Sequence, residues 1–310
     1  MKSILQKLAS FWFRPIAPER LSILRLITGG FSLWYLLARY EMFQKIAQSE
    51  LSLYDPVGLA TLLSEPLSFP VFKGLLLLTI GLNILYILGW KFRFTGPLFA
   101  LSLMLLMCYR NSWSMIYHNY NGLVMHVMVI GFTAAADTLS IDAWRQKGTK
   151  WLEEVKPDWQ YGWPILLICT LTVITYVLAG FAKIYGDLAW DWMSGEAMRS
   201  QVAVDAIRKN LFGSQASPLF EWIYPHTSLF LMMGIMTMIL ELGAPLALLN
   251  QKIGYIWALL TCSMHWGIYF IMGIHFPYQM GGFIFLAFFP LERLWFMART
   301  RLIKAKLIAQ

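Results

Sequence analysis

Residues 163–183 read WPILLICTLTVITYVLAGFAK, a nearly unbroken apolar run whose only charged residue is its last, Lys183. A hydrocarbon core about 30 Å thick needs roughly 20 such residues in a helix to cross it. Similar runs recur along the chain, so the sequence predicts an all-α, polytopic membrane protein, a bundle of about eight transmembrane helices. Whether the short eighth span crosses the membrane or re-enters it is left open. The expected spans are about 21–40, 71–90, 95–110, 119–136, 163–183, 228–249, 253–274 and 278–291.

The composition favours a membrane protein over a soluble one. Hydrophobic residues make up 58% of the 310 residues, charged residues make up 14%, and the mean hydropathy is +0.56. A soluble domain averages about 45–50% apolar and about 25% charged residues. The formal net charge of +8 raises the alternative of nucleic acid binding. The basic residues flank the apolar segments, however, so the expected partner is the lipid bilayer and not nucleic acid.

The basic residues also predict how the chain is oriented. With the N-terminus in the cytoplasm, 16 of the 25 Lys and Arg residues lie on the cytoplasmic side, six lie on the other side and three lie within spans. Cytoplasmic loops are enriched in Lys and Arg, so both termini are expected to be cytoplasmic. Residues 1–20 hold no apolar signal-peptide core and are interpreted as an interfacial stretch. The whole chain, 1–310, is interpreted as a single transmembrane domain.

Lys183 is the first candidate site residue, because an ionisable group inside a span is costly. It ends the fifth span on the outer side of the membrane. Trp190 follows it in the aromatic segment 184–227, which is interpreted as an interfacial cap. Lys183 has two interpretations. Either it extends its ammonium among the lipid headgroups, or it is desolvated and gives up its proton readily enough to act as a base.

A second polar stretch opens the fourth span, also on the outer side. Within it, His118 is interpreted either as an interfacial hydrogen-bonding residue or as a functional group. His275 ends the seventh span on the same side. Three titratable groups at one depth, Lys183, His118 and His275, predict a pocket that opens to the outer leaflet. The polar residues of the stretch are Tyr117, His118, Asn119 and Asn121.

Glu241 in the sixth span and His265 in the seventh are further ionisable groups within the membrane. Glu241 can pair with His265 or with Arg25 of the first span, and such a pairing offsets burial without any catalysis. The histidines lack the short spacing and the nearby carboxylates that are typical of zinc ligands. No metal site is therefore predicted.

The segment Y-V-L-A-G-F-A-K-I-Y-G-D-L-A-W-D-W-M-S-G, residues 176–195, resembles the AG-x-x-K … W-x-x-G segment of the vitamin K-dependent γ-glutamyl carboxylases. More broadly, it resembles the HTTM (horizontally transferred transmembrane) domain family that contains them. Residues 111–144, with H-N-Y-N-G and D-T-L-S-I-D-A-W, are similar to the fourth-helix region of this family. Residues 239–247 and 265–280 resemble its later helices. The resemblance covers about residues 15–295.

The resemblance implies an enzyme that deprotonates a reduced naphthoquinone, of the menaquinol or vitamin K hydroquinone type. Oxygen then yields a strong base, which removes a γ-proton from a peptide glutamate before carbon dioxide adds. The catalytic lysine of the family corresponds to Lys183, and its active-site histidine corresponds to His118. The residues expected to line or support this pocket are Tyr117, Asn119, Asn121, Trp190, Glu241, His265 and His275.

The chain stops soon after the eighth span, so the large extramembrane domain with which animal carboxylases hold their protein substrate is not expected. Two functions stay open. One is a carboxylase-like enzyme that acts on a quinone and on a small peptide or protein. The other is a non-enzymatic membrane partner that helps a peptide or toxin to mature or to leave the cell. A transporter is disfavoured because no repeat symmetry is visible. The expected location is a bacterial cytoplasmic membrane, with the site facing the periplasm.

Overall fold

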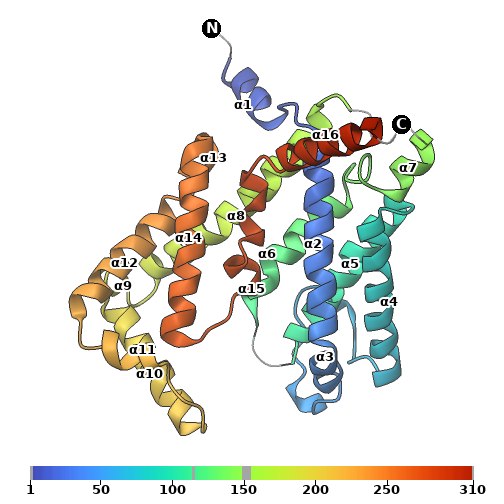
Figure 1. Ribbon diagram of the computed structural model, residues 1–310. Coiled ribbons are helices and arrows are strands. Elements are labelled where there is room, and N and C mark those ends of the chain that lie inside the picture. The colour runs from blue at the N-terminus through green and yellow to red at the C-terminus, as the bar shows by residue number, and fades with distance from the viewer. Residues whose placement is uncertain (1–2, 114–115, 149–154, 309–310) are drawn as a thin grey trace. The chain divides into compact units, whose positions relative to one another are not determined.

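The computed structural model describes residues 3–113, 116–148 and 155–308, and the regular elements of this part of the chain are all helices (Figure 1). The helices form two compact units. Unit 1 comprises Met1–Ile168 and Pro290–Gln310, and unit 2 comprises Cys169–Phe289. The all-α fold class is therefore confirmed. The interpretation of the chain as a single domain stays a prediction.

Unit 1 is built on four helices from the apolar runs of the first half of the chain. α2 (Pro18–Ala38) packs against α4 (Phe69–Leu88) and α6 (Asn121–Gly131), and α5 (Phe92–Asn111) packs against α4 and α6. Prolines at the first turns of α2 and α4 suit these positions, since the amide hydrogen they lack has no helical partner there. The shorter elements are α1 (Ile4–Trp12), α3 (Tyr40–Ile46), η1 (Leu51–Leu53), η2 (Gly58–Leu62), η3 (His118–Tyr120), α7 (Ile141–Lys147) and α16 (Glu292–Ile308).

Two glycines set how closely α5 and α6 approach each other. A Cβ atom on Gly96 would lie 2.6 Å from the carbonyl oxygen of Gly131, and a Cβ atom on Gly131 would lie 2.8 Å from the carbonyl oxygen of Gly96. Small residues permit this backbone contact between membrane helices. Any larger side chain at either position would push the two helices apart.

Arg25 is fully buried in unit 1 although it lies in a membrane-length helix. Its guanidinium donates to the carbonyl oxygens of Tyr86 and Ile87 at 2.8 and 2.7 Å. It also donates to those of Ala135 and Leu139 at 3.0 and 2.5 Å. The last carbonyls of a helix have no partner within it. Arg25 therefore satisfies the end of α4 and the link between α6 and α7.

Unit 2 contains the later part of α8 (Trp159–Tyr185) and the elements from α9 to η5. α12 (Thr227–Leu242) packs against α9 (Asp191–Ser194), α10 (Glu196–Leu211) and α14 (Gln251–Met272). The segment after α8 is thus packed onto long helices of its unit instead of forming a free linker. The shorter elements are α11 (Pro218–Ile223), α13 (Leu246–Leu249), α15 (Pro277–Met280) and η5 (Phe283–Phe288).

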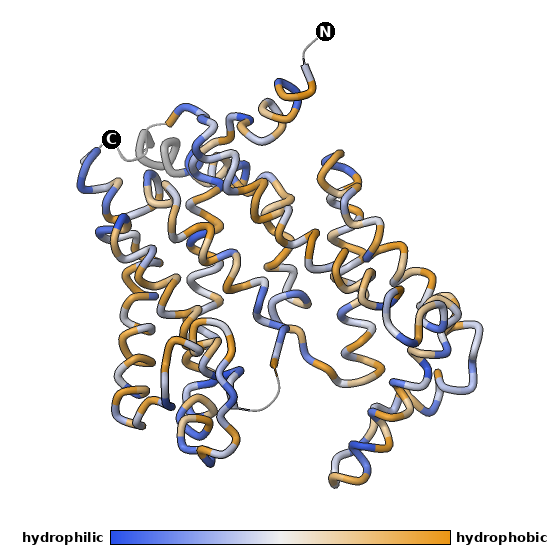
Figure 2. The backbone as a smooth tube through the Cα atoms, turned by 180° about the vertical axis from the view of Figure 1, so that it is seen from behind, coloured by the Kyte–Doolittle hydropathy of each residue, from blue (hydrophilic) through white to orange (hydrophobic). Residues whose placement is uncertain are grey.

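Five helices of the described residues are long and apolar enough to cross a membrane: α2, α4, α5, α8 and α14. Large apolar side chains stay exposed along them, such as Leu77 and Leu78 on α4 and Ile256 and Leu259 on α14. Figure 2 shows hydrophobic residues along the long helices and hydrophilic residues mainly near their ends. Large exposed apolar surfaces are rare on water-soluble proteins. These surfaces fit contact with lipid, and the predicted class of polytopic helical membrane protein is confirmed.

Two of the expected spans form shorter helices than predicted. The span expected at 119–136 corresponds to α6, which has 11 residues and ends at Gly131. The span expected at 228–249 corresponds to α12, which has 16 residues and ends before Pro245. A proline disfavours helical backbone in the residue before it. The apolar composition of this segment therefore continues beyond the point where its helix ends.

The eighth expected span, 278–291, does not form one helix in the described chain. It is divided between α15 and the 3₁₀ segment η5. Gly282 separates the two with a left-handed φ of +73°, a conformation that ends a helix. The number of membrane crossings stays a prediction, because the helices of membrane length are five rather than eight within the described residues.

The last described helix lies beside the start of α2. Nε of Arg20 lies 3.7 Å from Oε2 of Glu292, and α16 packs against α2. The first and last described helices, α1 and α16, therefore lie at the same end of unit 1 (Figure 1). This arrangement agrees with termini on one side of a membrane, whereas their cytoplasmic location stays a prediction.

Candidate active site

Lys183 and Glu241 form a largely buried ion pair in unit 2. Nζ of Lys183 lies 2.6 Å from both Oε1 and Oε2 of Glu241. The side chain of Lys183 is 18% exposed, and that of Glu241 is 6% exposed. A lysine that reaches for lipid headgroups would extend its ammonium outward. This ammonium is turned toward a carboxylate, so the described structure does not show it reaching outward. The role of Lys183 as a base stays a prediction.

A glycine brings the helices of this pair together. Lys183 lies in the last turn of α8, and Glu241 lies next to the last residue of α12. Gly180 is on the same face of α8 as Lys183, because residues three apart are neighbours on a helix. A Cβ atom on Gly180 would lie 3.1 Å from Cβ of Glu241 and 2.8 Å from Cδ2 of Leu242. The glycine of the A-G-F-A-K motif thus lets α8 lie close enough to α12 for the ion pair.

An aromatic ring covers the ammonium. Nζ of Lys183 lies 5.3 Å from the centre of the Trp192 ring, within the range of a cation–π interaction. Two glycines place this ring. A Cβ atom on Gly234 of α12 would lie 2.4 Å from the carbonyl oxygen of Trp192. Gly195 ends α9 with φ at +86°, and its Cβ would lie 2.3 Å from the carbonyl carbon of Phe230.

Gly234→Ala is expected to displace α9 and to lower the free energy of unfolding by about 1–3 kcal/mol, because the new methyl group meets a backbone oxygen that cannot move aside. The midpoint of thermal unfolding in detergent would measure the loss. Gly267→Ala in α14 is the matched control, since its Cβ would have no atom within 4 Å. That variant should keep or slightly raise the midpoint. Equal midpoints for the two variants would refute the close packing of α9 on α12.

An aromatic cluster supports Glu241 from α8 and α14. Tyr176 lies seven residues before Lys183 on the same face of α8, and its ring is 5.3 Å from that of Trp257 and 5.9 Å from that of His265. Nε1 of Trp257 donates to the carbonyl oxygen of Leu240 at 2.9 Å. This bond holds α14 against α12 beside Glu241. Neither Tyr176 nor Trp257 was predicted as a site residue from the sequence. The spacing of seven residues between Tyr176 and Lys183, about two helical turns, could have identified Tyr176.

His265 is part of this cluster and not a partner of Glu241. Its Nδ1 lies 2.9 Å from the carbonyl oxygen of Thr261, one turn earlier in α14. The predicted pairing of Glu241 with His265 or Arg25 is therefore wrong for the described structure. Glu241 pairs with Lys183, and Arg25 bonds to backbone carbonyls of unit 1. His265 supports the site through ring packing alone.

Two residues expected near Lys183 have other neighbours. The ring of His275 is exposed and lies 4.5 Å from that of Tyr269. Trp190 is exposed at the start of α9, and the tryptophan that covers Lys183 is Trp192 instead. The sequence analysis singled out Trp190 and not Trp192, two residues further along the chain. The left-handed turn at Gly195 and the contact at Gly234 decide which one faces the lysine.

The remaining predicted residues belong to unit 1. His118 and Asn119 lie in η3, and Asn121 begins α6. His118 is exposed, as is Tyr117, whose ring lies 4.5 Å from the guanidinium carbon of Arg110. Because these residues and Lys183 are in different units, a common pocket that includes His118 stays a prediction. Within residues 3–113, 116–148 and 155–308, no group of three or more His, Cys, Asp or Glu is arranged to hold a metal ion.

The membrane-length helices and the buried Lys–Glu pair define a polytopic helical membrane protein with an ionisable site. The sequence model of the HTTM domain matches residues 13–292, and the chain belongs to this family. The resemblance stated from the sequence is therefore confirmed, and the relationship to vitamin K-dependent carboxylases is consistent with the family. No curated protein and no solved structure matches the chain significantly.

Proposed function

We propose that this protein is a membrane enzyme of the vitamin K-dependent carboxylase type, in which Lys183 is the base. The observation that carries the proposal is the environment of Nζ of Lys183. It lies 2.6 Å from both oxygens of Glu241 and 5.3 Å from the Trp192 ring, at the end of a membrane-length helix. A base at this position can meet a lipid-soluble substrate that arrives from the bilayer.

Glu241 supports this role as a positioning residue. A lysine accepts a proton only as a neutral amine. In a desolvated pair, the ammonium proton can pass along the short hydrogen bond to Glu241, which replaces two buried charges with a neutral amine and a neutral carboxylic acid. When Lys183 then takes a proton from a hydroxyl group, an O–H bond breaks and an N–H bond forms. The pair then carries one positive charge beside the anion that it has made.

The residues around the pair fit a flat aromatic compound that carries a hydroxyl group. Trp192 presents a ring beside Nζ, and Phe181 and Tyr185 of α8 are 45% and 84% exposed near the same end of the helix. A reduced naphthoquinone, when bound, supplies the hydroxyl proton and, with oxygen, the strong base of the carboxylase reaction. In the proposal, Lys183 accepts the proton and His118 assists. The role of His118 is proposed because it corresponds to the active-site histidine of the family.

The proposal extends to the second substrate and to the location. The acceptor is a glutamate side chain of a small peptide or protein, by resemblance to the carboxylases. The membrane is the bacterial cytoplasmic membrane, and the site faces the periplasm. The excess of Lys and Arg in the loops on the other side supports this orientation.

Aerobic incubation of the purified protein with a reduced naphthoquinone tests the proposal, with mass spectrometry to detect the epoxide. Lys183→Arg keeps a cation for Glu241 but cannot give up its proton. This variant is expected to form epoxide at least about 100-fold more slowly while its unfolding midpoint stays near that of the wild type. Full activity of the arginine variant would remove Lys183 from the role of base.

A second function is supported by the same ion pair. A lysine whose ammonium is bonded to both oxygens of a buried carboxylate also joins α8 to α12 structurally. A non-enzymatic partner in peptide or toxin maturation needs only this structural role. Absence of epoxide from folded wild-type protein, together with a co-purifying peptide that is chemically unchanged, would favour this function.

A further inference from the structure

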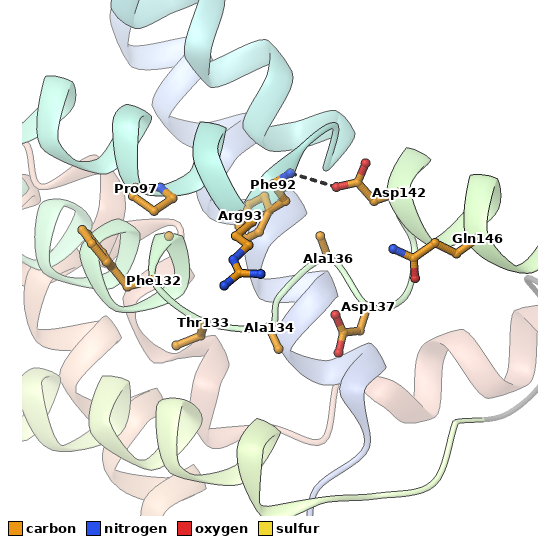
Figure 3. A pocket seen from close by; sticks show the side chains of 11 residues that line it. Phe92, Arg93, Pro97, Phe132, Thr133, Ala134, Ala136, Asp137, Asp142 and Gln146 are labelled. Carbon is orange, nitrogen blue, oxygen red and sulfur yellow. Dashed lines mark hydrogen bonds between the residues drawn. The ribbon is translucent and has the colours of Figure 1, made fainter.

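A pocket of about 490 Å³ lies within unit 1, where α5 begins and where the chain runs from α6 to α7 (Figure 3). Phe92, Arg93 and Pro97 line it from α5, and Phe132 and Asp137 line it from the link after α6. None of these residues takes part in the proposed deprotonation. The pocket is therefore a candidate for a separate binding site.

Arg93 brings a cation into this pocket. In Figure 3 its side chain extends between the wall formed by Pro97 and Phe132 and the wall that carries Asp137. Arg93 is exposed, and it forms no hydrogen bond or ion pair with the described residues. Its guanidinium therefore has its full set of donors for a ligand. Guanidinium groups bind phosphate oxygens with two parallel hydrogen bonds.

A carboxylate stands on the other wall. Oδ2 of Asp137 accepts a hydrogen bond of 2.7 Å from the hydroxyl of Tyr161, and its Oδ1 has no bond from the described residues. Asp142 is occupied, because its two oxygens accept from the backbone amides of Lys91 and Phe92 at 2.9 and 2.8 Å. Asp137 is thus the acid of this pocket that can receive a ligand, and it forms no ion pair with Arg93.

The pocket opens at the level of a membrane surface. α5 is of membrane length and begins at Phe92, so its first turn lies where a span meets the headgroups. Exposed aromatic residues surround this turn: Phe94, Phe132 and Trp144. Aromatic residues gather at membrane interfaces. Phe132, 56% exposed, provides the pocket with an apolar edge beside its charged walls.

We propose that this pocket binds the headgroup of a phospholipid that carries both a phosphate and a primary ammonium, such as phosphatidylethanolamine. Arg93 binds the phosphate, Oδ1 of Asp137 accepts from the ammonium, and Phe132 and Pro97 contact the glycerol and the start of the acyl chains. The juxtaposition of one available cation, one available carboxylate oxygen and an apolar edge selects this headgroup.

Other lipid headgroups match the walls less well. An anionic glycerol headgroup satisfies Arg93 but leaves Asp137 beside a polar group without positive charge. A quaternary ammonium carries no hydrogen for Oδ1 of Asp137, and its recognition relies on aromatic rings around the cation. A primary ammonium donates up to three hydrogen bonds. The pocket is therefore expected to prefer phosphatidylethanolamine to phosphatidylglycerol and phosphatidylcholine.

Native mass spectrometry of the full chain, delipidated in detergent and titrated with each of the three lipids, tests the proposal. Arg93→Gln is expected to weaken phosphatidylethanolamine binding about tenfold. Asp137→Asn is expected to weaken it similarly while leaving phosphatidylglycerol binding unchanged or stronger. Arg145→Gln is the matched control, because Arg145 is an exposed cation of α7 outside the pocket. Unfolding midpoints show whether each variant is folded.

Two outcomes would overturn the proposal. One is equal binding of the three lipids, or binding that Arg93→Gln and Asp137→Asn leave as unchanged as Arg145→Gln does. The other is equally tight binding of glycerophosphoethanolamine, the same headgroup without acyl chains, which would make the ligand a water-soluble phosphodiester. Phosphatidylethanolamine binding that is selective, chain-dependent and lowered by both pocket variants would support the proposal.

Discussion

Replacing Lys183 with methionine is expected to lower the free energy of unfolding by about 3–5 kcal/mol, because it leaves the Glu241 carboxylate buried without its partner. Glu241 is 6% exposed, and both of its oxygens bond to Lys183. The double variant Lys183→Met/Glu241→Met replaces the pair with apolar side chains. It is expected to recover most of the loss, since a buried pair exchanged for well-packed hydrophobic residues is often neutral. Unfolding in detergent, followed by circular dichroism, would measure both.

Arg208→Gln is the control for this pair of variants. Arg208 lies 3.0 Å from Asp205, but its side chain is 61% exposed, so its removal is expected to change stability by less than about 1 kcal/mol. If Lys183→Met lowers the free energy of unfolding as little as Arg208→Gln does, the buried pair is not formed in the folded protein. If the double variant is as unstable as the single one, the loss comes from packing and not from an unpaired charge. The double variant also keeps the fold while removing the proposed base.

The long helices could be predicted because hydrophobic length determines what spans a bilayer. The apolar segments that form α4, α8 and α14 are long enough to cross a membrane, and they form helices of 20, 27 and 22 residues. Composition does not report whether the backbone continues as a helix. Gly282 and Pro245 interrupt segments that are apolar throughout. The shortened α12 and the divided eighth segment follow from these two backbone effects.

Lys183 could be identified from the sequence because a charge within a span needs a reason. Its partner could not be identified, because hydropathy contains no information on which helices are neighbours. The sequence offered His265 and Arg25 as partners of Glu241, yet each bonds to backbone carbonyls near it instead. Only the close approach of α8 and α12 at Gly180 makes Lys183 the partner.

The pocket of unit 1 had no sequence signal of its own. In the sequence, Arg93 is one of the many basic residues that flank the apolar segments and has nothing else to distinguish it. Asp137 and Asp142 follow each other closely in a polar link, and their different roles depend on which donors the fold brings to them. In both units, the proposed role depends on whether a carboxylate is free or already accepts hydrogen bonds from neighbouring residues. It is determined by tertiary contacts, and no local pattern contains it.

Arg25→Met is expected to have the largest effect on stability, a loss of about 4–6 kcal/mol, because four buried hydrogen bonds to carbonyl oxygens are lost at once. The side chain is fully buried, so water cannot replace it without opening unit 1. It also lies against the turn after α4, where Gly89 has φ at +63° and its Cβ would lie 2.6 Å from Nη1 of Arg25. The loss should therefore extend to the junction of α4 and α5.

Arg25→Lys separates the contribution of the guanidinium hydrogen bonds from that of the positive charge, and Arg93→Gln is its control. Arg25→Lys keeps the charge but offers three donors from one atom, so it cannot reach carbonyls that lie along different edges of the planar guanidinium. It is expected to recover only part of the stability. Arg93→Gln removes an arginine that makes no bond within the described residues and should unfold with a midpoint near that of the wild type. Full recovery by lysine would show that the interior of unit 1 needs a cation and not this pattern of hydrogen bonds.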